Sequence, residues 1–345
     1  MDRICRSLSD AGHRVVLVGR KRRTSLPLTD RPYKQVRLRC PAEKGFLFYA
    51  SFNIQLFFFL LFKKMDGICA IDLDTILPVM WVSKLKNVKR LYDAHELFCE
   101  MKEIAERPRI HAFWKLLERY TIPRFKYGYT VNEPIAAEFH KMYGSRFAVI
   151  RNIALYDPLK MGAEKERFIL YQGAVNEGRS FETLIPAMQW VSAPLWICGD
   201  GNFMKQAREL VIHHNLQDKV FFKGMITPAA LKNITSKAMI GITLFEAGAK
   251  SNYYSLANRF FDYIHAGVPQ VCSDFPVYRE INQKYRVAVL VKDQSPEGLA
   301  KAINTLLHDK ERWENIHREC MQAARELNWQ QESEKLVNYY HNIFG

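Results

Sequence analysis

Clustered cysteines are absent from this sequence. Its seven cysteines stand singly along the chain with no Cys-x-x-Cys spacing, at Cys5, Cys40, Cys69, Cys99, Cys198, Cys272 and Cys320. This excludes a disulfide scaffold and a cysteine-based zinc module, because both need cysteines in recurring pairs. An odd number of isolated thiols is typical of reduced, mostly structural cysteines, so we expect a cytoplasmic protein.

A run of apolar residues long enough to span a membrane is also lacking, and we expect no signal peptide. The longest apolar run, Phe52–Phe62, is about half of a spanning helix and contains Asn53 and Gln55. No internal repeat or low-complexity linker interrupts the 345 residues, of which 48% are hydrophobic. The length predicts two domains, and the composition is sufficient for a large core in each.

Acidic residues are scarce relative to basic ones. The chain has 50 Lys and Arg against 36 Asp and Glu, which gives a formal net charge of +14. This balance predicts acidic partners, of which nucleotide diphosphates, anionic lipid surfaces and nucleic acid are the main classes. We find no Arg-Gly-aromatic signature and no basic recognition helix, so we expect no nucleic-acid partner.

Short apolar strands alternate with helical segments along the chain, a rhythm that predicts an α/β fold with parallel sheets. We expect strands at residues 14–19, 36–39, 67–71, 88–92, 127–131, 147–150, 168–171, 195–198, 219–222, 238–245, 270–272 and 287–291. We expect helices at residues 2–11, 46–64, 109–121, 133–142, 228–236, 256–266, 297–308 and 329–343.

The stretch from Ser255 to Pro269 is the centre of the functional prediction. Leu256 opens an amphipathic helix that Gly267 ends, and a loop of polar and small residues, Glu246–Tyr254, precedes it. In parallel sheets such loops lie beyond the carboxyl ends of the strands, where ligands bind. The first turn of the helix, with Asn258, offers N–H groups suited to phosphate, and Asp262 is placed to accept hydrogen bonds from ribose hydroxyls. The alternative is a plain amphipathic helix with a solvent-facing Asp262.

Two further loops in the second half carry glycine after a strand. Gly173 opens the first loop and Arg179 closes it, whereas Gly199, Asp200 and Gly201 form the second. Such loops let backbone N–H groups approach phosphate, and Arg179 can bind phosphate through two hydrogen bonds. The alternative for Arg179 is an exposed residue at a helix start.

The first half has two polar strand ends. His95 follows the strand at 88–92, where its side chain is expected to point into a crevice, unless it caps the next helix. Asp72 and Asp74 form an Asp-x-Asp pair after the strand at 67–71. Such a pair can hold a divalent metal, but the strand-end context favours a turn or helix-cap role, so we predict no metal.

These segments together resemble the glycosyltransferases of family 4, which have the GT-B fold. The resemblance covers nearly the whole chain and rests on Asp93-Ala94-His95-Glu96, on the glycine-bearing loops and on the helix that ends in Gly-x-Pro. It implies two Rossmann-like doubly wound domains facing a cleft, and retaining transfer of a sugar from a nucleotide-diphospho-sugar, with no cofactor. Four positions depart from the family pattern. Tyr254 and Asp262 each replace a Glu, and of the two cations that bind the diphosphate, Ala174 replaces an Arg and Arg179 replaces a Lys.

The resemblance also implies a role for each candidate residue. His95 would contact the donor sugar, Glu246 the sugar hydroxyls, and Asp262, in place of the family's Glu, the ribose. The remaining donor-binding residues would be Gly173, Arg179, Gly199, Asp200, Gly201, Ser255, Leu256 and Asn258. The acceptor would be a glycan or a lipid-linked glycan, most simply in the synthesis of cell-surface polysaccharide.

Domain boundaries follow from the same resemblance. Residues 1–152 would form an acceptor-side domain, 153–166 a linker, 167–326 the nucleotide-sugar domain, and 327–345 a helix that returns to the first domain. The first strand and loop of the first domain are missing. We therefore expect the strands at 14–19 and 67–71 to share no neighbour, the Ile4–Leu8 face of the first helix to be exposed, and activity and stability to be reduced.

The apolar segment Phe46–Lys64 has two interpretations. With the basic stretch Arg20–Arg23 it suggests peripheral docking on an anionic inner leaflet. Alternatively, it is a helix that is apolar all round because it is buried in the first domain.

Two other function classes remain open. One is an inactive nucleotide-binding or scaffold protein, suggested by the missing strand, by Ala174 and by Asp262. The other is a sugar-nucleotide epimerase of the same fold, since fold alone does not determine function.

Overall fold

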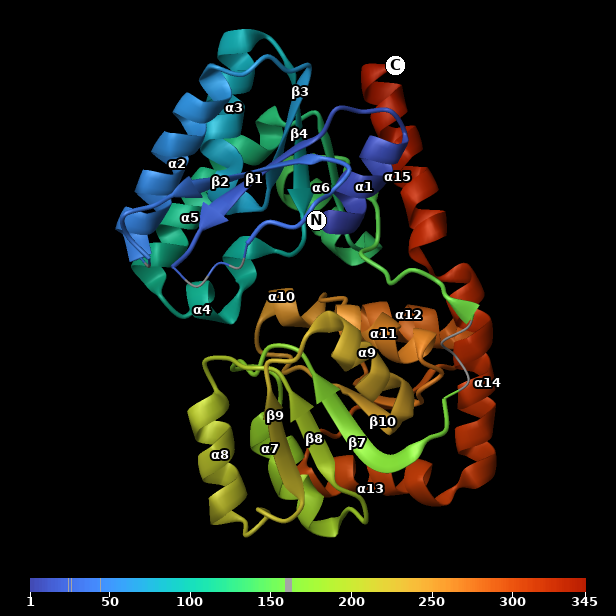
Figure 1. Ribbon diagram of the computed structural model, residues 1–345. Helices are drawn as coiled ribbons and strands as arrows, with labels where there is room; N and C mark the ends of the chain where they lie inside the picture. The colour runs from blue at the N-terminus through green and yellow to red at the C-terminus, as the bar shows by residue number, and fades with distance from the viewer. Residues whose placement is uncertain (24, 26, 44, 159–162) are drawn as a thin grey trace. The chain divides into compact units, whose positions relative to one another are not determined.

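The computed structural model describes residues 1–345 apart from 24, 26, 44 and 159–162 (Figure 1). The described chain divides into two compact units. Unit 1 contains Met1–Cys99, Glu103–Arg151 and Gln330–Gly345, and unit 2 contains Glu100–Lys102 and Asn152–Trp329. The predicted linker covers residues 153–166. Its residues 159–162 lie outside the described residues, and the rest of it belongs to unit 2.

Up to residue 151 the chain forms the following elements: α1 (Asp2–Asp10), β1 (Val16–Lys21), β2 (Lys34–Arg39), α2 (Gly45–Leu61), β3 (Gly67–Ile71), the 3₁₀ turn η1 (Leu73–Thr75), α3 (Ile76–Lys86), β4 (Lys89–Ala94), α4 (Lys102–Ala105), α5 (Pro108–Thr121), β5 (Tyr127–Thr130), α6 (Glu133–Tyr143) and β6 (Ala148–Val149).

The rest of the chain forms β7 (Glu166–Gln172), α7 (Phe181–Ala187), β8 (Leu195–Cys198), α8 (Met204–His213), β9 (Val220–Gly224), α9 (Pro228–Lys237), β10 (Ala238–Thr243), α10 (Lys250–Tyr253), α11 (Asn258–His265), β11 (Gln270–Ser273), α12 (Pro276–Tyr285), β12 (Ala288–Val291), α13 (Pro296–His308), α14 (Lys310–Glu326) and α15 (Trp329–Phe344).

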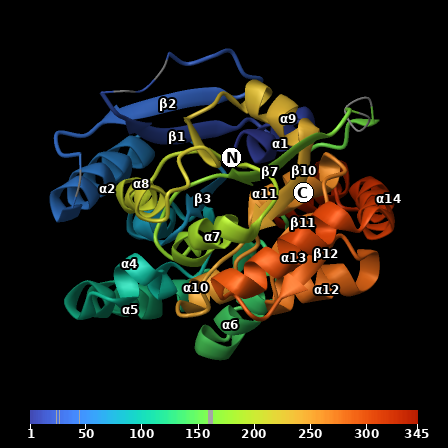
Figure 2. The same ribbon diagram turned by 90° about the horizontal axis from the view of Figure 1, so that it is seen from below.

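Unit 2 is built on one continuous parallel sheet in the order β12-β11-β10-β7-β8-β9. The strands read as near-continuous apolar runs because helices cover both faces of the sheet. Helices α7 and α13 lie side by side over one face (Figure 2). Tyr263 of α11 packs into the core on the other face, together with Phe168 and Leu170 of β7. This is the doubly wound arrangement predicted for the second half.

Unit 1 has two parallel sheets, one of β1 and β2 and one in the order β3-β4-β5-β6. Within the described residues, β1 pairs with β2 and β3 pairs with β4, and the two sheets share no strand. The prediction that the segments at 14–19 and 67–71 have no common neighbour is therefore confirmed.

The predicted exposure of the first helix is wrong. Ile4, Cys5 and Leu8 on α1 are buried inside unit 1, with Ile4 and Leu8 only 7% and 5% exposed. Their spacing puts them on one face of the helix, and that face is held inward by the chain around it. Tyr33 donates a hydrogen bond to Asp2 at 2.6 Å, which ties the start of α1 to the segment before β2.

Helix α2 is not buried all round, so that interpretation of its composition is wrong as well. Phe52, Leu56 and Leu60 are buried, whereas Leu47 and Ile54 are 71% and 58% exposed. A helix that is apolar on every side has no sequence pattern to tell which side is covered. Across the described residues, no helix has both the length and the apolar character needed to cross a membrane.

The loop before the signature helix also differs from the prediction. Part of the stretch predicted as loop, Glu246–Tyr254, folds into the short helix α10, and α11 begins at Asn258 rather than Leu256. Ala257 keeps an extended backbone because its N–H donates to the hydroxyl of Tyr278 at 3.1 Å, which delays the first helical residue.

Candidate functional site

The site in unit 2 lies at the place where the strand order reverses. From β7 the chain moves outward through β8 and β9, and then returns to β10 on the other side of β7. In doubly wound sheets the loops on the two sides of such a reversal leave in opposite directions, and ligands bind in the crevice between them. The loop after β7 carries Gly173 and Arg179, and the loop after β10 carries Phe245 and Glu246.

Two glycines let the loops after β7 and β8 approach each other closely. Gly173 and Gly199 have φ of 124° and 149°, and the N–H of Gly173 donates to the carbonyl of Cys198 at 3.0 Å. A Cβ on Gly199 would lie 1.8 Å from the carbonyl oxygen of Gly173. No side chain fits at that distance, so backbone groups line the crevice at this point.

Asp200 and Gly201 hold the second loop against the first. The carbonyl of Asp200 accepts a hydrogen bond from the N–H of Val175 at 3.1 Å, and its carboxylate accepts one from the N–H of Gly201 at 2.8 Å. A Cβ on Gly201 would lie 2.3 Å from the carbonyl oxygen of Val175. Gly173, Gly199, Asp200 and Gly201 are thus brought together, as one folded pair of loops.

Arg179 joins the loop after β7 to the segment after β10. Its guanidinium donates to the side-chain oxygen of Asn252 at 2.8 Å and lies 4.4 Å from the ring centroid of Phe245. The N–H of Glu246 donates to the carbonyl of Gly178 at 3.1 Å. Arg179 and Glu246 are therefore neighbours at the mouth of the crevice.

The carboxylate of Glu246 has a cationic partner. Its Oε2 lies 3.2 Å from Nζ of Lys102, and both side chains are about one-third exposed, at 36% and 28%. An ion pair of this exposure is weak, because water screens both charges. It leaves the carboxylate accessible and fixes its direction.

The predicted residues at the start of α11 lie in three different environments. Leu256 packs against the core of unit 2, so it supports the site through its backbone. Asn258 is exposed as the first helical residue. The hydroxyl oxygen of Ser255 is buried and has no hydrogen-bond partner among the described residues.

Asp262 is half-buried and belongs to a hydrogen-bond chain. Gln172, the last residue of β7, donates from Nε2 to Oδ2 of Asp262 at 3.0 Å, and its own Oε1 accepts from the hydroxyl of Thr235 at 2.6 Å. The carboxylate is thus tied to the carboxyl end of β7 while part of the side chain stays exposed.

Sequence reasoning missed Arg259, in the first turn of the same helix. It is 8% exposed, and its guanidinium lies 4.7 Å from the ring centroids of both Tyr171 and Phe245. The signal in the sequence was the spacing of Arg259 and Tyr263, since residues four apart lie on one face of a helix.

The corresponding strand ends in unit 1 gather acidic groups around His95. Nε2 of His95 lies 3.4 Å from Oδ2 of Asp93, which is 2% exposed. The backbone N–H of His95 donates to Oδ1 of Asp72 at 2.9 Å. Asp72 has a positive φ of 53° and makes no side-chain cap for η1. Its carboxylate therefore accepts a hydrogen bond from His95 instead of capping its own turn.

Burial and charge oppose each other at His95. Burial disfavours the imidazolium, but the hydrogen bond and charge of Asp93, with the charge of Asp72, outweigh burial and raise the pKa of His95 to about 9. Burial raises the pKa of Asp72, and burial with the charge of Asp72 raises the pKa of Asp74 to about 6. His95 is therefore a cation at neutral pH, in a pocket of carboxylates.

Two protein-family models match this chain, one over each half. The family model described as "Glycosyltransferase Family 4" matches residues 1–153, and the one described as "Glycosyl transferases group 1" matches residues 160–326. The chain belongs to the family 4 glycosyltransferases. No curated protein matches it at a significant level.

Solved structures similar to this glycosyltransferase show the GT-B fold. Sucrose-phosphate synthase from Thermosynechococcus elongatus is 18% identical with a TM-score of 0.77, over 99% of this chain and 92% of that one. HepE from Anabaena, solved with UDP and glucose, is 12% identical with a TM-score of 0.74, over 99% and 95%. A point mutant of TarM from S. aureus, solved with UDP and sugar ligands, is 14% identical with a TM-score of 0.67, over 84% and 58%.

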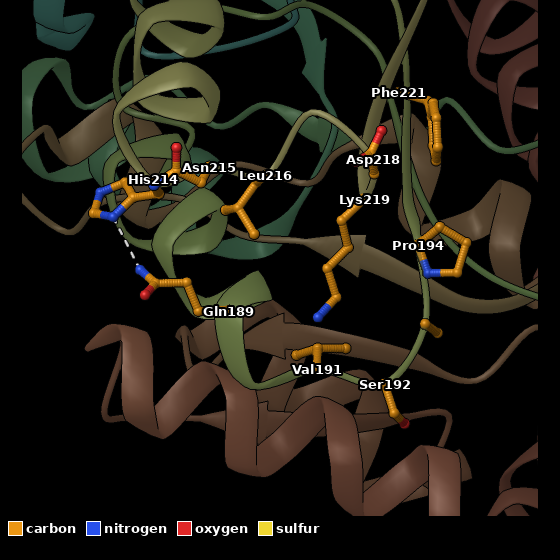
Figure 3. Close-up of a pocket in the computed structure, with 11 residues that line it drawn as sticks. Gln189, Val191, Ser192, Pro194, His214, Asn215, Leu216, Asp218, Lys219 and Phe221 are labelled. Carbon is orange, nitrogen blue, oxygen red and sulfur yellow. Dashed lines mark hydrogen bonds between the residues drawn. The ribbon is translucent and has the colours of Figure 1, made fainter.

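A separate pocket of the glycosyltransferase lies at the opposite edge of the unit 2 sheet (Figure 3). Pro194 and Lys219, which line it, immediately precede β8 and β9, and Gln189 and His214 are hydrogen-bonded across it at 2.9 Å. Ligands of doubly wound sheets bind at the carboxyl ends of strands, so this pocket is not the candidate site. In the part of the chain that the structure describes, no group of three His, Cys, Asp or Glu side chains is arranged to hold a metal.

Proposed function

We propose that this glycosyltransferase moves a sugar from a nucleotide-diphospho-sugar to a glycan or lipid-linked acceptor, with retention of configuration. The observation that carries the donor assignment is the position of Arg179. It stands at the end of a glycine-bearing loop beside the reversal of strand order, where a diphosphate would meet backbone N–H groups and a guanidinium together. HepE was solved with UDP and glucose, which supports a nucleotide-linked donor of this kind.

In the proposed reaction, the acceptor hydroxyl oxygen forms a bond to the anomeric carbon as the bond from that carbon to the β-phosphate oxygen breaks. The acceptor proton passes to the departing phosphate oxygen, so the products are a glycoside and a nucleoside diphosphate. Negative charge grows on the leaving group, and Arg179 with the N–H groups around it would stabilise that charge. We propose that this needs no metal ion and no cofactor.

The ribose and sugar contacts complete the donor assignment. Asp262 would accept hydrogen bonds from the ribose, since a carboxylate has several acceptor positions and can hold Gln172 at the same time. Glu246 would accept from sugar hydroxyls at its exposed side. His95, held as a cation by Asp93 and Asp72, would donate to a sugar hydroxyl.

We also propose peripheral binding to an anionic membrane, through an apolar surface of unit 1. Helix α3 packs beside both α2 and α5 (Figure 1). Large apolar side chains on or next to all three helices are exposed. This apolar surface consists of Phe46, Leu47, Ile54, Phe58, Phe62, Trp81, Leu85, Ile110, Phe113, Leu116 and Tyr120.

Exposed basic residues on the same helices and at their ends, Lys63, Lys64, Lys84, Arg107, Arg109 and Arg119, give the apolar surface a positive border. Apolar groups that enter the bilayer interface and cations that meet anionic headgroups reinforce each other. A cytoplasmic protein bound to the inner leaflet would reach a lipid-linked acceptor in this way, as in the synthesis of cell-surface polysaccharide.

A thermal-shift screen tests the donor assignment. A ligand that binds only the folded state raises the melting temperature by mass action. We expect UDP, GDP or ADP, and the matching nucleotide-sugar, to raise it, while the free nucleoside does not. A chain that melts at one temperature with every nucleotide contradicts the proposal, and release of nucleoside diphosphate only in the presence of an acceptor supports transfer over hydrolysis.

A further inference from the structure

We propose that the buried Arg259 is a second cation of the diphosphate site and binds the nucleoside diphosphate together with Arg179. The proposal rests on the proposed function, because it assigns a residue to the donor site described above. It would give the site two guanidinium groups, one half-exposed on a loop and one beneath the loop on α11.

The first argument is that the charge of Arg259 is buried without an acidic partner. The side chain is 8% exposed, and among the described residues no carboxylate lies within salt-bridge distance of it. Its contacts are two long hydrogen bonds, from Nη1 to the hydroxyl of Tyr171 at 3.4 Å and from Nη2 to the carbonyl of Leu244 at 3.3 Å. A buried charge is costly unless it is paired, so this guanidinium is poised to receive an anion.

The second argument is that hydrogen-bonding atoms near the start of α11 lack partners. Nε of Arg259 and the hydroxyl oxygen of Ser255 are both buried with no hydrogen-bond partner in the described chain. They belong to residues four apart, at the end of the crevice loop and in the first turn of the helix. Two buried polar groups without hydrogen-bond partners destabilise the folded state, unless a ligand forms hydrogen bonds with them.

The third argument is that Arg259 lies directly against the glycine loop. A Cβ on Gly173 would be 3.3 Å from Nη1 of Arg259. An anion that approaches the N–H groups of this loop therefore also approaches the guanidinium, and any residue larger than glycine would crowd it.

The fourth argument is that Arg179 and Arg259 share one aromatic ring. Their guanidinium carbons lie 4.4 and 4.7 Å from the ring centroid of Phe245, which brings both cations to one side chain. Two cations held around one ring repel each other, and a ligand with two or more negative charges removes that repulsion. The ring itself favours both cations, which explains how they are held in place without a ligand.

Calorimetry on three variants tests the proposal. UDP, GDP and ADP are titrated into the wild-type chain, and the nucleotide that binds is compared with its monophosphate in Arg259→Met, Arg259→Lys and the control Arg208→Met. We expect Arg259→Met to weaken diphosphate binding about ten- to a hundredfold and monophosphate binding less, because a charged hydrogen bond to the second phosphate is lost. Arg259→Lys should recover part of the loss.

Arg208 is a matched control because its guanidinium also lies over a ring, 4.6 Å from the centroid of Phe222, but on the exposed face of α8. Its replacement should leave the affinity unchanged. If the wild-type chain binds no nucleoside diphosphate, the donor assignment itself fails. If it binds one and Arg259→Met binds equally well, the role of Arg259 is refuted while the donor assignment stands.

A measurement on the wild-type chain covers the case in which Arg259→Met does not fold. The ¹⁵N–¹H signal of the arginine Nε of Arg259, assigned by through-bond connectivity, is followed during titration with the same nucleotide. We expect a large shift with the diphosphate and a smaller one with the monophosphate. A signal that stays in place when the protein is saturated would overturn the proposal.

Discussion

The carboxyl edges of the two main sheets have opposite chemistry. In unit 2 the loops beyond β7 and β10 bring Arg179 and Arg259 to one aromatic ring. In unit 1 the carboxyl ends of β3 and β4 bring Asp72 and Asp93 to one histidine. Both sites occupy the place where parallel sheets bind ligands, but one collects positive charge and the other negative charge around a single cation.

This contrast shows how much the fold decides and how much the side chains decide. The fold places both sets of residues at strand ends, and their chemistry gives each a different task. The two guanidinium groups suit a phosphate ligand. The paired carboxylates do not bind an anion, but they keep His95 protonated, so that a neutral hydroxyl can accept a hydrogen bond from it.

The largest effect we predict is at the glycine pair of unit 2. In Gly199→Ala the new Cβ would lie 1.8 Å from the carbonyl oxygen of Gly173, at a φ of 149° that alanine disfavours. The two loops must separate, so we expect the free energy of unfolding to fall by about 3–5 kcal/mol. Urea titration followed by circular dichroism measures the change.

Gly248→Ala is the control for that variant, because nothing lies within 4 Å of its Cβ position. It should change the free energy of unfolding by less than about 0.5 kcal/mol. Equal stability of Gly199→Ala and the wild-type chain would mean that the loops after β7 and β8 do not meet as described.

The next effect is at the acidic site of unit 1. Asp93→Asn removes the closest charge from His95, so the pKa of His95 should fall clearly below its value of about 9. NMR titration of the imidazole Cε1–H measures it. The fall should be incomplete, because Asp72 still accepts from the backbone of His95 and its charge still favours the imidazolium.

The same substitution changes how stability depends on pH. A histidine whose pKa is raised on folding stabilises the protein fully below its unfolded pKa, and this is lost as pH rises through its folded pKa. In the wild-type chain the free energy of unfolding should fall by up to about 3 kcal/mol between about pH 6.5 and 9. In Asp93→Asn the free energy of unfolding should depend less steeply on pH over the same range. Asp74→Asn is the control, since Asp74 is buried nearby but does not act on His95.

Much of the fold is readable from the sequence because it depends on local patterns. The strands at 67–71 and 195–198 were predicted to the residue, since short apolar runs between polar turns have few alternatives. The side of α2 that is covered was not predictable, because an apolar residue stands at nearly every position. The burial of Ile4 and Leu8 depends on contacts of α1 with distant segments, which no local pattern encodes.

The site was readable only in part, for a related reason. Glycine after a strand is a local signal, and it led to Gly173 and Gly199. Arg259 was missed because a charged residue in a helix is taken as solvent-facing, whereas here two aromatic rings surround it. Asp93, near the end of β4, stands two residues before His95, and residues two apart in an extended chain share one side, so the spacing could have identified the pair.

A smaller effect is expected at the exposed cation of unit 2. Arg179→Ala should weaken nucleoside-diphosphate binding by about 1.5–3 kcal/mol, the range for hydrogen bonds to charged groups. Isothermal calorimetry measures the affinity, and Arg208→Ala serves as the control. Unchanged affinity would remove Arg179 from the diphosphate site.

The smallest effect per residue is expected at the apolar surface of unit 1. Phe58 and Trp81 are 53% and 47% exposed on α2 and α3, so their replacement by Glu leaves the core of unit 1 intact. Each apolar ring lost from a bilayer interface, and each negative charge placed near anionic headgroups, should weaken binding by roughly 1 kcal/mol. We therefore expect the double variant Phe58→Glu, Trp81→Glu to float poorly with anionic liposomes that carry the wild-type chain upward at low salt.

Unit 2 supplies the control that distinguishes membrane docking from nonspecific adsorption through exposed apolar residues. Trp190 is also an exposed aromatic residue, at 51%, but it lies in unit 2 and is not part of the apolar surface of α2, α3 and α5. Trp190→Glu should float as well as the wild-type chain, and all the variants should remain at the bottom with neutral liposomes in high salt, where headgroup attraction is screened.

Wild-type protein that stays at the bottom with anionic liposomes at low salt would end the docking proposal. Equal loss in Trp190→Glu would instead assign the binding to exposed apolar residues in general, and the two units would no longer differ in this respect.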